Sequence, residues 1–111
     1  MTPKTIPFVK AFKARFQKGP TYTAATYDAI NLLKESIEKA GSADADKLVS
    51  VLEQSSSVGT AASLEFTKTH DPVWGIGKYT GIAVQWRNGK KIPFWPPEVK
   101  GMQKFGLPGE S

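Results

Sequence analysis

The sequence predicts a small α/β domain in which three helices are followed by a short strand and a C-terminal β-hairpin. Three observations lead to this class. The chain has 111 residues, 40% hydrophobic and 23% charged, which is a globular composition and a length suited to one domain. Apolar residues recur every three or four positions in the first half and alternate later. Asn88-Gly89 between two alternating runs is a strong hairpin signal.

The first helix is expected from Thr5 to Lys18, with Thr5 as its cap and Gly19-Pro20 as its stop. Phenylalanine recurs at every fourth position, at Phe8, Phe12 and Phe16. This spacing puts the three rings on one face, which we expect to pack in the core.

The second helix is expected from Thr23 to Ala40, with a capped N-terminus in the threonine-rich stretch before it and Gly41 as its stop. Its apolar stripe steps by three and four residues and is widened by two neighbouring positions. The stepping residues are Tyr27, Ile30, Leu33, Ile37 and Ala40, and the widening ones are Leu32 and Ala29. We expect this stripe to face the core.

A third, shorter helix follows, capped by Ser42 or Asp44. Three of its apolar side chains are expected to face inward: Leu48, Val51 and Leu52. The serine run from residue 55 to 57 and Gly59 are expected to end it. Leu64 and Phe66 then alternate with polar residues, which predicts a short strand that places both on one face.

The β-hairpin is expected on either side of Asn88-Gly89. Ile82, Val84 and Trp86 share one face, which we expect to be the inward one together with Trp95. Pro93 has no N–H to donate, so it is expected at an edge or a bulge of the return strand. After Pro96-Pro97 the tail is expected to be loop or loosely ordered.

The sequence carries no recognisable catalytic apparatus, metal site or cofactor motif. It has no cysteine and one histidine, His70, which stands beside Asp71. Such a pair can supply a catalytic base, but in a proline-containing turn it is more often structural. An enzyme using His70 and Asp71 is therefore the weakest of the functional hypotheses, and we expect no enzymatic activity.

The net charge of +5 raises the question of nucleic acid, although a surface charge that aids solubility is the simpler interpretation. The best candidate is the hairpin tip from Arg87 to Lys91, which has Trp86 and Trp95 nearby. A small basic nucleic-acid-binding module therefore remains as the alternative function. No apolar run is long enough to span a membrane, and the first residues show no secretory signal.

Several motifs together resemble the C-terminal part of type I periplasmic binding proteins, the substrate-binding components of ABC transporters of the branched-chain amino acid class. They are the "FKARF" helix, then "YDA" (Tyr27 to Ala29) opening a long helix that ends in "SIEKAG", and "ADKL" in the next helix. The last is "QWRNGK" with the "WP" that follows it. The resemblance covers residues 8 to 99, and its specificity lies in the order and spacing of the motifs.

The resemblance implies a fragment of the Rossmann-like lobe of such a protein, because the family's chains are much longer and have two lobes. We therefore expect a truncated chain or a separately encoded C-terminal segment. The implied function is binding of branched-chain amino acids or similar small molecules without chemistry. The implied partners are the ligand and an ABC permease, with neither nucleic acid nor membrane insertion. The implied location is periplasmic or extracellular, although this chain carries no signal peptide.

The family's cleft also implies where this chain would touch its ligand. The turn into the "YDA" helix borders that cleft, which points to Tyr22, Thr23, Ala24 and Thr26, with Tyr22 and Ala24 foremost. The competing interpretation is that Tyr22 merely packs against the first helix.

The implied organisation is one small domain in four parts. Residues 1–68 form the helical part of the first lobe, 69–80 a hinge-like crossing, 81–96 the hairpin and 97–111 the tail. A hairpin without its second lobe would expose apolar faces, so we expect a homodimer formed by hairpin exchange.

Overall fold

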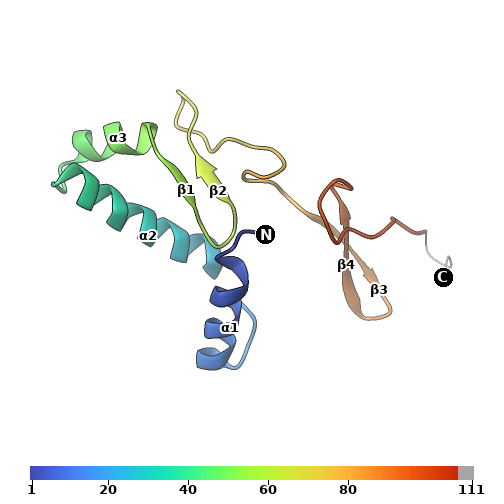
Figure 1. Cartoon of the computed structure of the whole chain (residues 1–111). Helices are drawn as coiled ribbons and strands as arrows, with labels where there is room; N and C mark the ends of the chain where they lie inside the picture. Colours follow the sequence, from blue (N-terminus) through green and yellow to red (C-terminus); the bar gives the residue numbers. More distant parts are fainter. Residues whose placement is uncertain (108–111) are drawn as a thin grey trace. The chain divides into compact units, whose positions relative to one another are not determined.

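The computed structural model describes residues 1–107 and divides the chain into two compact units, Met1–Tyr79 and Thr80–Ser111. The first unit holds three helices and one small antiparallel sheet, and the second holds another small antiparallel sheet (Figure 1). The predicted order of helices and strands is thus confirmed, with one strand more than expected. The predicted domain boundaries and the hinge stay predictions.

The first helix, α1 (Thr5–Phe16), ends two residues earlier than the sequence suggested. Gln17 adopts a left-handed conformation with φ of 56°, and its N–H donates to the carbonyl of Lys13 at 2.9 Å. This residue, rather than Gly19, therefore ends the helix. The expected cap is also wrong, because Thr5 is the first helical residue and its hydroxyl donates to the carbonyl of Thr60 at 2.7 Å.

The second helix, α2 (Thr23–Ala40), has the predicted bounds and ends at Gly41 with φ of 62°. Its N-cap residue is Tyr22, which makes no side-chain cap hydrogen bond, so the expected capped start is wrong. The expected inward stripe is confirmed at Leu32 and wrong at three of its other positions. Tyr27, Ile30 and Leu33 are 51%, 65% and 48% exposed, whereas the buried positions of this helix are Leu32 and Ser36.

The third helix, α3 (Ala45–Glu53), is capped by Asp44, whose carboxylate accepts from the N–H of Lys47 at 3.1 Å. The structure thus decides between the two expected caps. The helix turns back along α2 (Figure 1). Its three predicted inward residues, Leu48, Val51 and Leu52, are half-buried, as the amphipathic pattern predicted.

The serine run was expected to end the third helix, but part of it forms a strand. β1 (Ser56–Val58) pairs antiparallel with β2 (Ser63–Glu65), in the register Ser57 opposite Leu64. Beyond β2, Phe66 bridges to Pro72. The strand predicted around Leu64 and Phe66 is confirmed, but as half of a hairpin.

The second unit is built on β3 (Ala83–Arg87) and β4 (Lys90–Trp95), joined by the predicted Asn88-Gly89 turn. Both turn residues have positive φ, 49° and 73°, as a type I′ turn requires. Pro93 lies opposite Val84 beside a bulge, which confirms its predicted placement.

The tail covers the face of β3 that was expected to point outward. The side-chain amide of Gln85 donates to the carbonyl of Gly106 and accepts from its N–H. Arg87 donates to the carbonyl of Lys104 at 3.1 Å. As a result Val84 and Trp86 are 48% and 66% exposed, so the predicted inward face is wrong. The last tail residues, 108–111, lie outside the described part of the chain.

Candidate functional site

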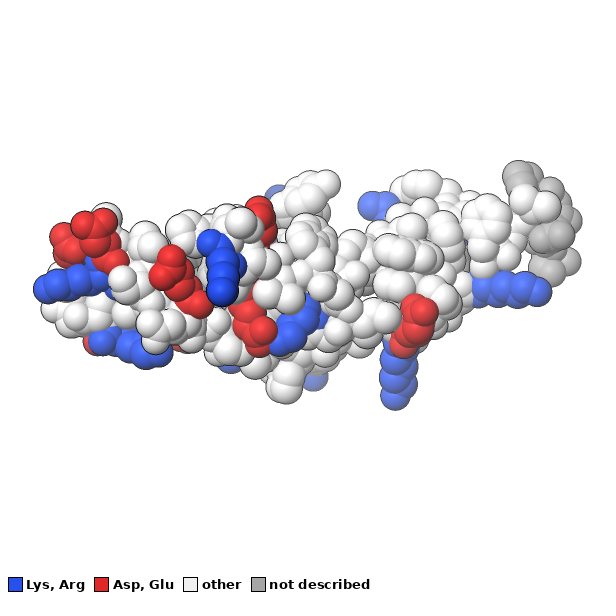
Figure 2. All heavy atoms as spheres, turned by 90° about the horizontal axis from the view of Figure 1, so that it is seen from above, with Lys and Arg blue, Asp and Glu red and all other residues white. Residues whose placement is uncertain are grey.

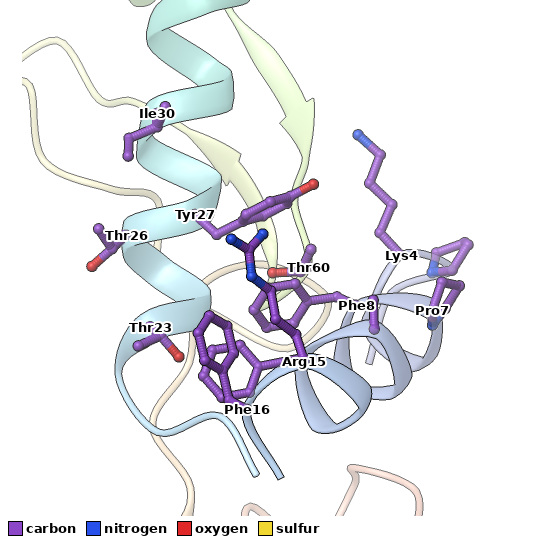
Figure 3. A pocket seen from close by; sticks show the side chains of 13 residues that line it. Lys4, Pro7, Phe8, Arg15, Phe16, Thr23, Thr26, Tyr27, Ile30 and Thr60 are labelled. Atoms are coloured by element: carbon purple, nitrogen blue, oxygen red, sulfur yellow. The ribbon is translucent and has the colours of Figure 1, made fainter. Parts of the chain in front are cut away.

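A large open groove lies between α1 and α2 and has a volume of about 800 Å³ (Figure 3). That volume lies in the range of small-molecule sites in proteins. Its lining is mostly apolar, and four aromatic side chains dominate it: Phe8, Phe12, Phe16 and Tyr27. The groove is therefore a candidate site for a molecule with an apolar body.

The spacing of phenylalanines along α1 builds one wall of this groove. Because residues four apart lie on one helix face, the rings of Phe8 and Phe12 are 5.9 Å apart between centroids, and those of Phe12 and Phe16 are 4.6 Å apart. Phe8 also contacts Tyr27 of α2, with 4.9 Å between ring centroids. The row was expected to be core. It is instead a surface that lines a hollow, with Phe16 50% exposed.

A buried turn fixes the start of α2 against the β1–β2 hairpin. One carboxylate oxygen of Asp28 accepts from the N–H and the hydroxyl of Thr60, at 2.6 and 2.8 Å. The other oxygen accepts from the N–H of Ala61 at 2.8 Å. Thr60 is only 3% exposed, so this carboxylate satisfies two donors of a buried residue.

The same turn also holds the start of α1. The hydroxyls of Thr2 and Thr5 donate to the carbonyls of Gly59 and Thr60, at 2.6 and 2.7 Å. Both helices that line the groove are thus tied to one loop. No local sequence pattern indicates this anchor, because its partners are 32 and 55 residues apart.

The charged side chains that line the groove are Lys4 and Arg15, and both are cationic. Neither forms an ion pair in the described part of the chain. The Arg15 guanidinium lies 5.5 Å from the centroid of the Phe16 ring, and its side chain rises from α1 in the direction of α2 (Figure 3). The groove therefore combines an apolar floor with positive charge that has no carboxylate partner.

Two of the four predicted contact residues line the groove, Thr23 and Thr26. The other two do not. Tyr22 is 93% exposed and lies just before the first residue of α2. Ala24 is half-buried, and its carbonyl accepts from the Thr60 hydroxyl at 3.5 Å. The spacing of the phenylalanine row was visible in the sequence, but the row was expected to be core. Neither the row nor Arg15 was predicted to line a site.

A second hollow, of about 370 Å³, lies between α2 and the β1–β2 hairpin. Aliphatic and aromatic side chains line most of it, among them Leu32, Leu52, Leu64 and Phe66. Among residues 1–79, Leu32 is the one buried aliphatic or aromatic side chain. This second hollow is therefore a loosely filled core rather than a separate site.

The basic hairpin tip keeps part of the expected nucleic-acid surface. The Lys91 ammonium lies 5.4 Å from the centroid of the exposed Trp86 ring. Arg87, however, is held by Gln85 and the tail, at 3.2 and 3.1 Å. On the face drawn in Figure 2, basic and acidic side chains are scattered among uncharged ones and form no continuous basic stripe.

His70 and Asp71 do not pair with each other. The His70 ring bonds Glu53 at 2.8 Å, and the Asp71 carboxylate accepts from the Thr69 hydroxyl at 2.8 Å. Both residues thus have local structural partners. Within the described residues, no cluster of three or more metal-binding side chains occurs. None of the helices described here has the length and apolarity needed to cross a membrane.

Comparison with known proteins gives one informative likeness. No protein-family model matches the sequence, and no curated protein matches it significantly. The fold is similar to the crystal structure of a leucine binding protein, LivK, from Thermotoga maritima, with a TM-score of 0.68 and 24% sequence identity. The match covers 89% of this chain and 28% of that one. The chain therefore has the fold of a portion of a leucine-binding protein, which confirms, for the fold, its resemblance to type I periplasmic binding proteins.

Proposed function

We propose that this chain supplies the C-terminal segment of a solute-binding protein that serves an ABC transporter. Its task would be to help bind branched-chain amino acids or similar small molecules without changing them chemically. One observation carries the proposal, the fold likeness over 89% of the chain to a protein named for leucine binding. The apolar groove at the start of α2 supports it, because it offers a leucine-sized side chain an environment away from water.

In this proposal the complete protein works by closing two lobes around the ligand and delivering it to a permease. The start of α2 forms part of one wall of the cleft, with contacts from Tyr22, Thr23, Ala24 and Thr26. Residues 69–80 serve as a crossing between the lobes. The protein would act in the periplasm or outside the cell.

Two-dimensional amide NMR spectra of the chain test the proposal directly. We would titrate it with leucine, isoleucine, valine and phenylalanine and follow the amide signals of residues 22–26. Saturable shifts confined to these residues and to the groove wall of α1 are expected. If these signals stay unmoved at millimolar ligand, the chain holds no working part of such a site.

A matched pair of variants makes the result specific. Replacing Thr26, which lines the groove, by valine removes a hydroxyl and should weaken the shifts. Ser50→Ala removes a hydroxyl from α3, where it donates to the carbonyl of Asp46 at 3.0 Å, and should leave them unchanged. Equal weakening in both variants would point to nonspecific contact.

The second candidate function is a nucleic-acid-binding module, favoured by the cation–π contact of Lys91 with the exposed Trp86. Phosphate binding releases counterions and weakens steeply with salt, whereas binding of a zwitterion does not. The same spectra with a short DNA duplex, at low and high salt, separate the two. Salt-sensitive shifts at residues 87–91, with none at 22–26, would favour the nucleic-acid function.

A further inference from the structure

We propose that the groove between α1 and α2 selects apolar carboxylates that carry no ammonium group, in preference to zwitterionic amino acids. The inference rests on the proposed function, since it assumes that this groove receives a small solute. It follows from the positive charges that line the groove and from the hydrogen bonds that the nearby carboxylate of Asp28 already accepts.

Every charged side chain in the lining is positive. Arg15 and Lys4 are both exposed and have no ion-pair partner among the described residues. A guanidinium with free N–H groups beside an apolar floor is suited to hold a carboxylate in two parallel hydrogen bonds. The anionic end of a ligand therefore has a partner in this groove.

A ligand ammonium has no such partner. The lining contains no Asp or Glu. Asp28, a carboxylate of α2 close by, does not line the groove, and both of its oxygens already accept hydrogen bonds from Thr60 and Ala61. An ammonium would meet only neutral hydroxyls and the repulsion of Arg15.

Aromatic faces can also attract a cation, but here the Phe16 face already interacts with the Arg15 guanidinium. The guanidinium of Arg15 lies 5.5 Å from the centroid of the Phe16 ring, and Phe8 is in contact with both Phe12 and Tyr27. The rings therefore serve mainly to take up an apolar body.

The dimensions suit a ligand of modest size. The phenylalanine row runs from Phe8 to Phe16, eight helical steps that correspond to about 12 Å. A branched six-carbon acid fits along it with its carboxylate at the Arg15 end. The volume of about 800 Å³ leaves room for a larger apolar body as well.

Three ligands with the same carbon skeleton test the inference. We would measure the affinity of the chain for 4-methylpentanoate, for leucine and for the neutral 4-methylpentanamide, by amide NMR titration at pH 7. Because a hydrogen bond to a charged group is worth about tenfold at the low end, the carboxylate should bind roughly tenfold more tightly than either competitor. Leucine binding as tightly as 4-methylpentanoate, or more tightly, overturns the inference and leaves the proposed function standing.

Arg15→Gln identifies the residue responsible, and Lys13→Gln is its matched control. Both remove one positive charge from an exposed position of α1, but only Arg15 lines the groove. We expect Arg15→Gln to lower the affinity for 4-methylpentanoate to that of the amide, and Lys13→Gln to leave it unchanged. Equal loss in both variants would show a general charge effect and overturn the inference. If none of the three ligands binds the native chain, the proposed function fails together with the inference.

Discussion

Gly59 occupies a position where any side chain would clash with a carboxylate that is already hydrogen-bonded. A Cβ atom at this position would lie 2.3 Å from a carboxylate oxygen of Asp28, a distance that side-chain carbons do not reach. Asp28 cannot retreat freely, because it holds the N–H groups of Thr60 and Ala61. The absence of a side chain at Gly59 thus allows the 59–61 turn to form its hydrogen bonds with both helices that line the groove.

We expect Gly59→Ala to lower the free energy of unfolding by about 1–3 kcal/mol, the usual penalty for leaving buried donors unsatisfied. Chemical denaturation followed by circular dichroism measures the loss. Gly19→Ala is the control, because its Cβ would meet only the flexible end of Lys13 at 4.0 Å. An unchanged midpoint in Gly59→Ala would contradict the described turn.

Glu65 provides a prediction about pH. Its hydrogen bond from Lys78, and next the one from the Ser56 hydroxyl, lower the pKa of the Glu65 carboxyl below its ordinary value. A carboxyl with a lowered pKa stabilises the fold above its ordinary pKa, and that stability is lost as the pH falls through the lowered value. Both partners are about one-third exposed, so we expect a small contribution to stability.

Following the Glu65 side-chain carboxyl by NMR from neutral to acidic pH checks this. Its midpoint should lie below that of an ordinary glutamate and should move upward in Lys78→Gln. Lys68→Gln removes an exposed lysine of the neighbouring loop and serves as the control. Identical midpoints in the native chain and in Lys78→Gln would rule out the described pair.

Among the elements, α2 shows what a local pattern predicts and what it does not. Its bounds follow from nearby residues, because Gly41 supplies the left-handed end. Its buried face depends on elements that approach from two sides, α1 along Tyr27 and the strands along Leu32. The predicted stripe therefore included the buried Leu32 but also the exposed Tyr27 and Ile30, which line the groove. Of the predicted contact residues, Thr23 and Thr26 line the groove and Tyr22 and Ala24 do not.

The β3–β4 hairpin shows the same limit. The Asn88-Gly89 turn is set by two adjacent residues and was predictable. The covered face depends on Gln85, a polar residue that reaches a tail carbonyl 21 positions away. Alternation of apolar residues carries no information about such a distant polar contact, so the expected inward face was the exposed one.

Gln85→Ala should release the tail from β3 while leaving the hairpin paired. The variant removes both hydrogen bonds to the backbone of Gly106, each worth about 1 kcal/mol. Amide hydrogen exchange at Gly106 should then accelerate roughly tenfold. Gln103→Ala is the control, because Gln103 contributes its backbone N–H to the carbonyl of Pro93. Unchanged exchange in Gln85→Ala would mean that other contacts hold the tail.

For the whole molecule, the exposed hairpin face bears on self-association. Val84 and Trp86 are exposed on one face of β3, and apolar side chains grouped in this way favour contact with another chain. We propose, as the family resemblance suggested, that two copies associate through this hairpin. Light scattering should then give the mass of a dimer.

A double variant tests which surface is responsible for the dimer. Val84→Thr with Trp86→Thr keeps strand-forming residues but removes the apolar face, so it should shift the mass to that of one chain. Val49→Thr changes another exposed valine, on α3, and should have no effect. A native chain that scatters as a monomer contradicts the proposed dimer.

The composition of the groove also determines how its occupants would be detected. The chain has three tryptophans, Trp74, Trp86 and Trp95, and none of them lines the groove. Apart from phenylalanines, the aromatic side chain in the groove lining is Tyr27. A ligand entering between α1 and α2 would therefore leave the indole fluorescence unchanged, and a screen based on that emission would record a filled groove as empty.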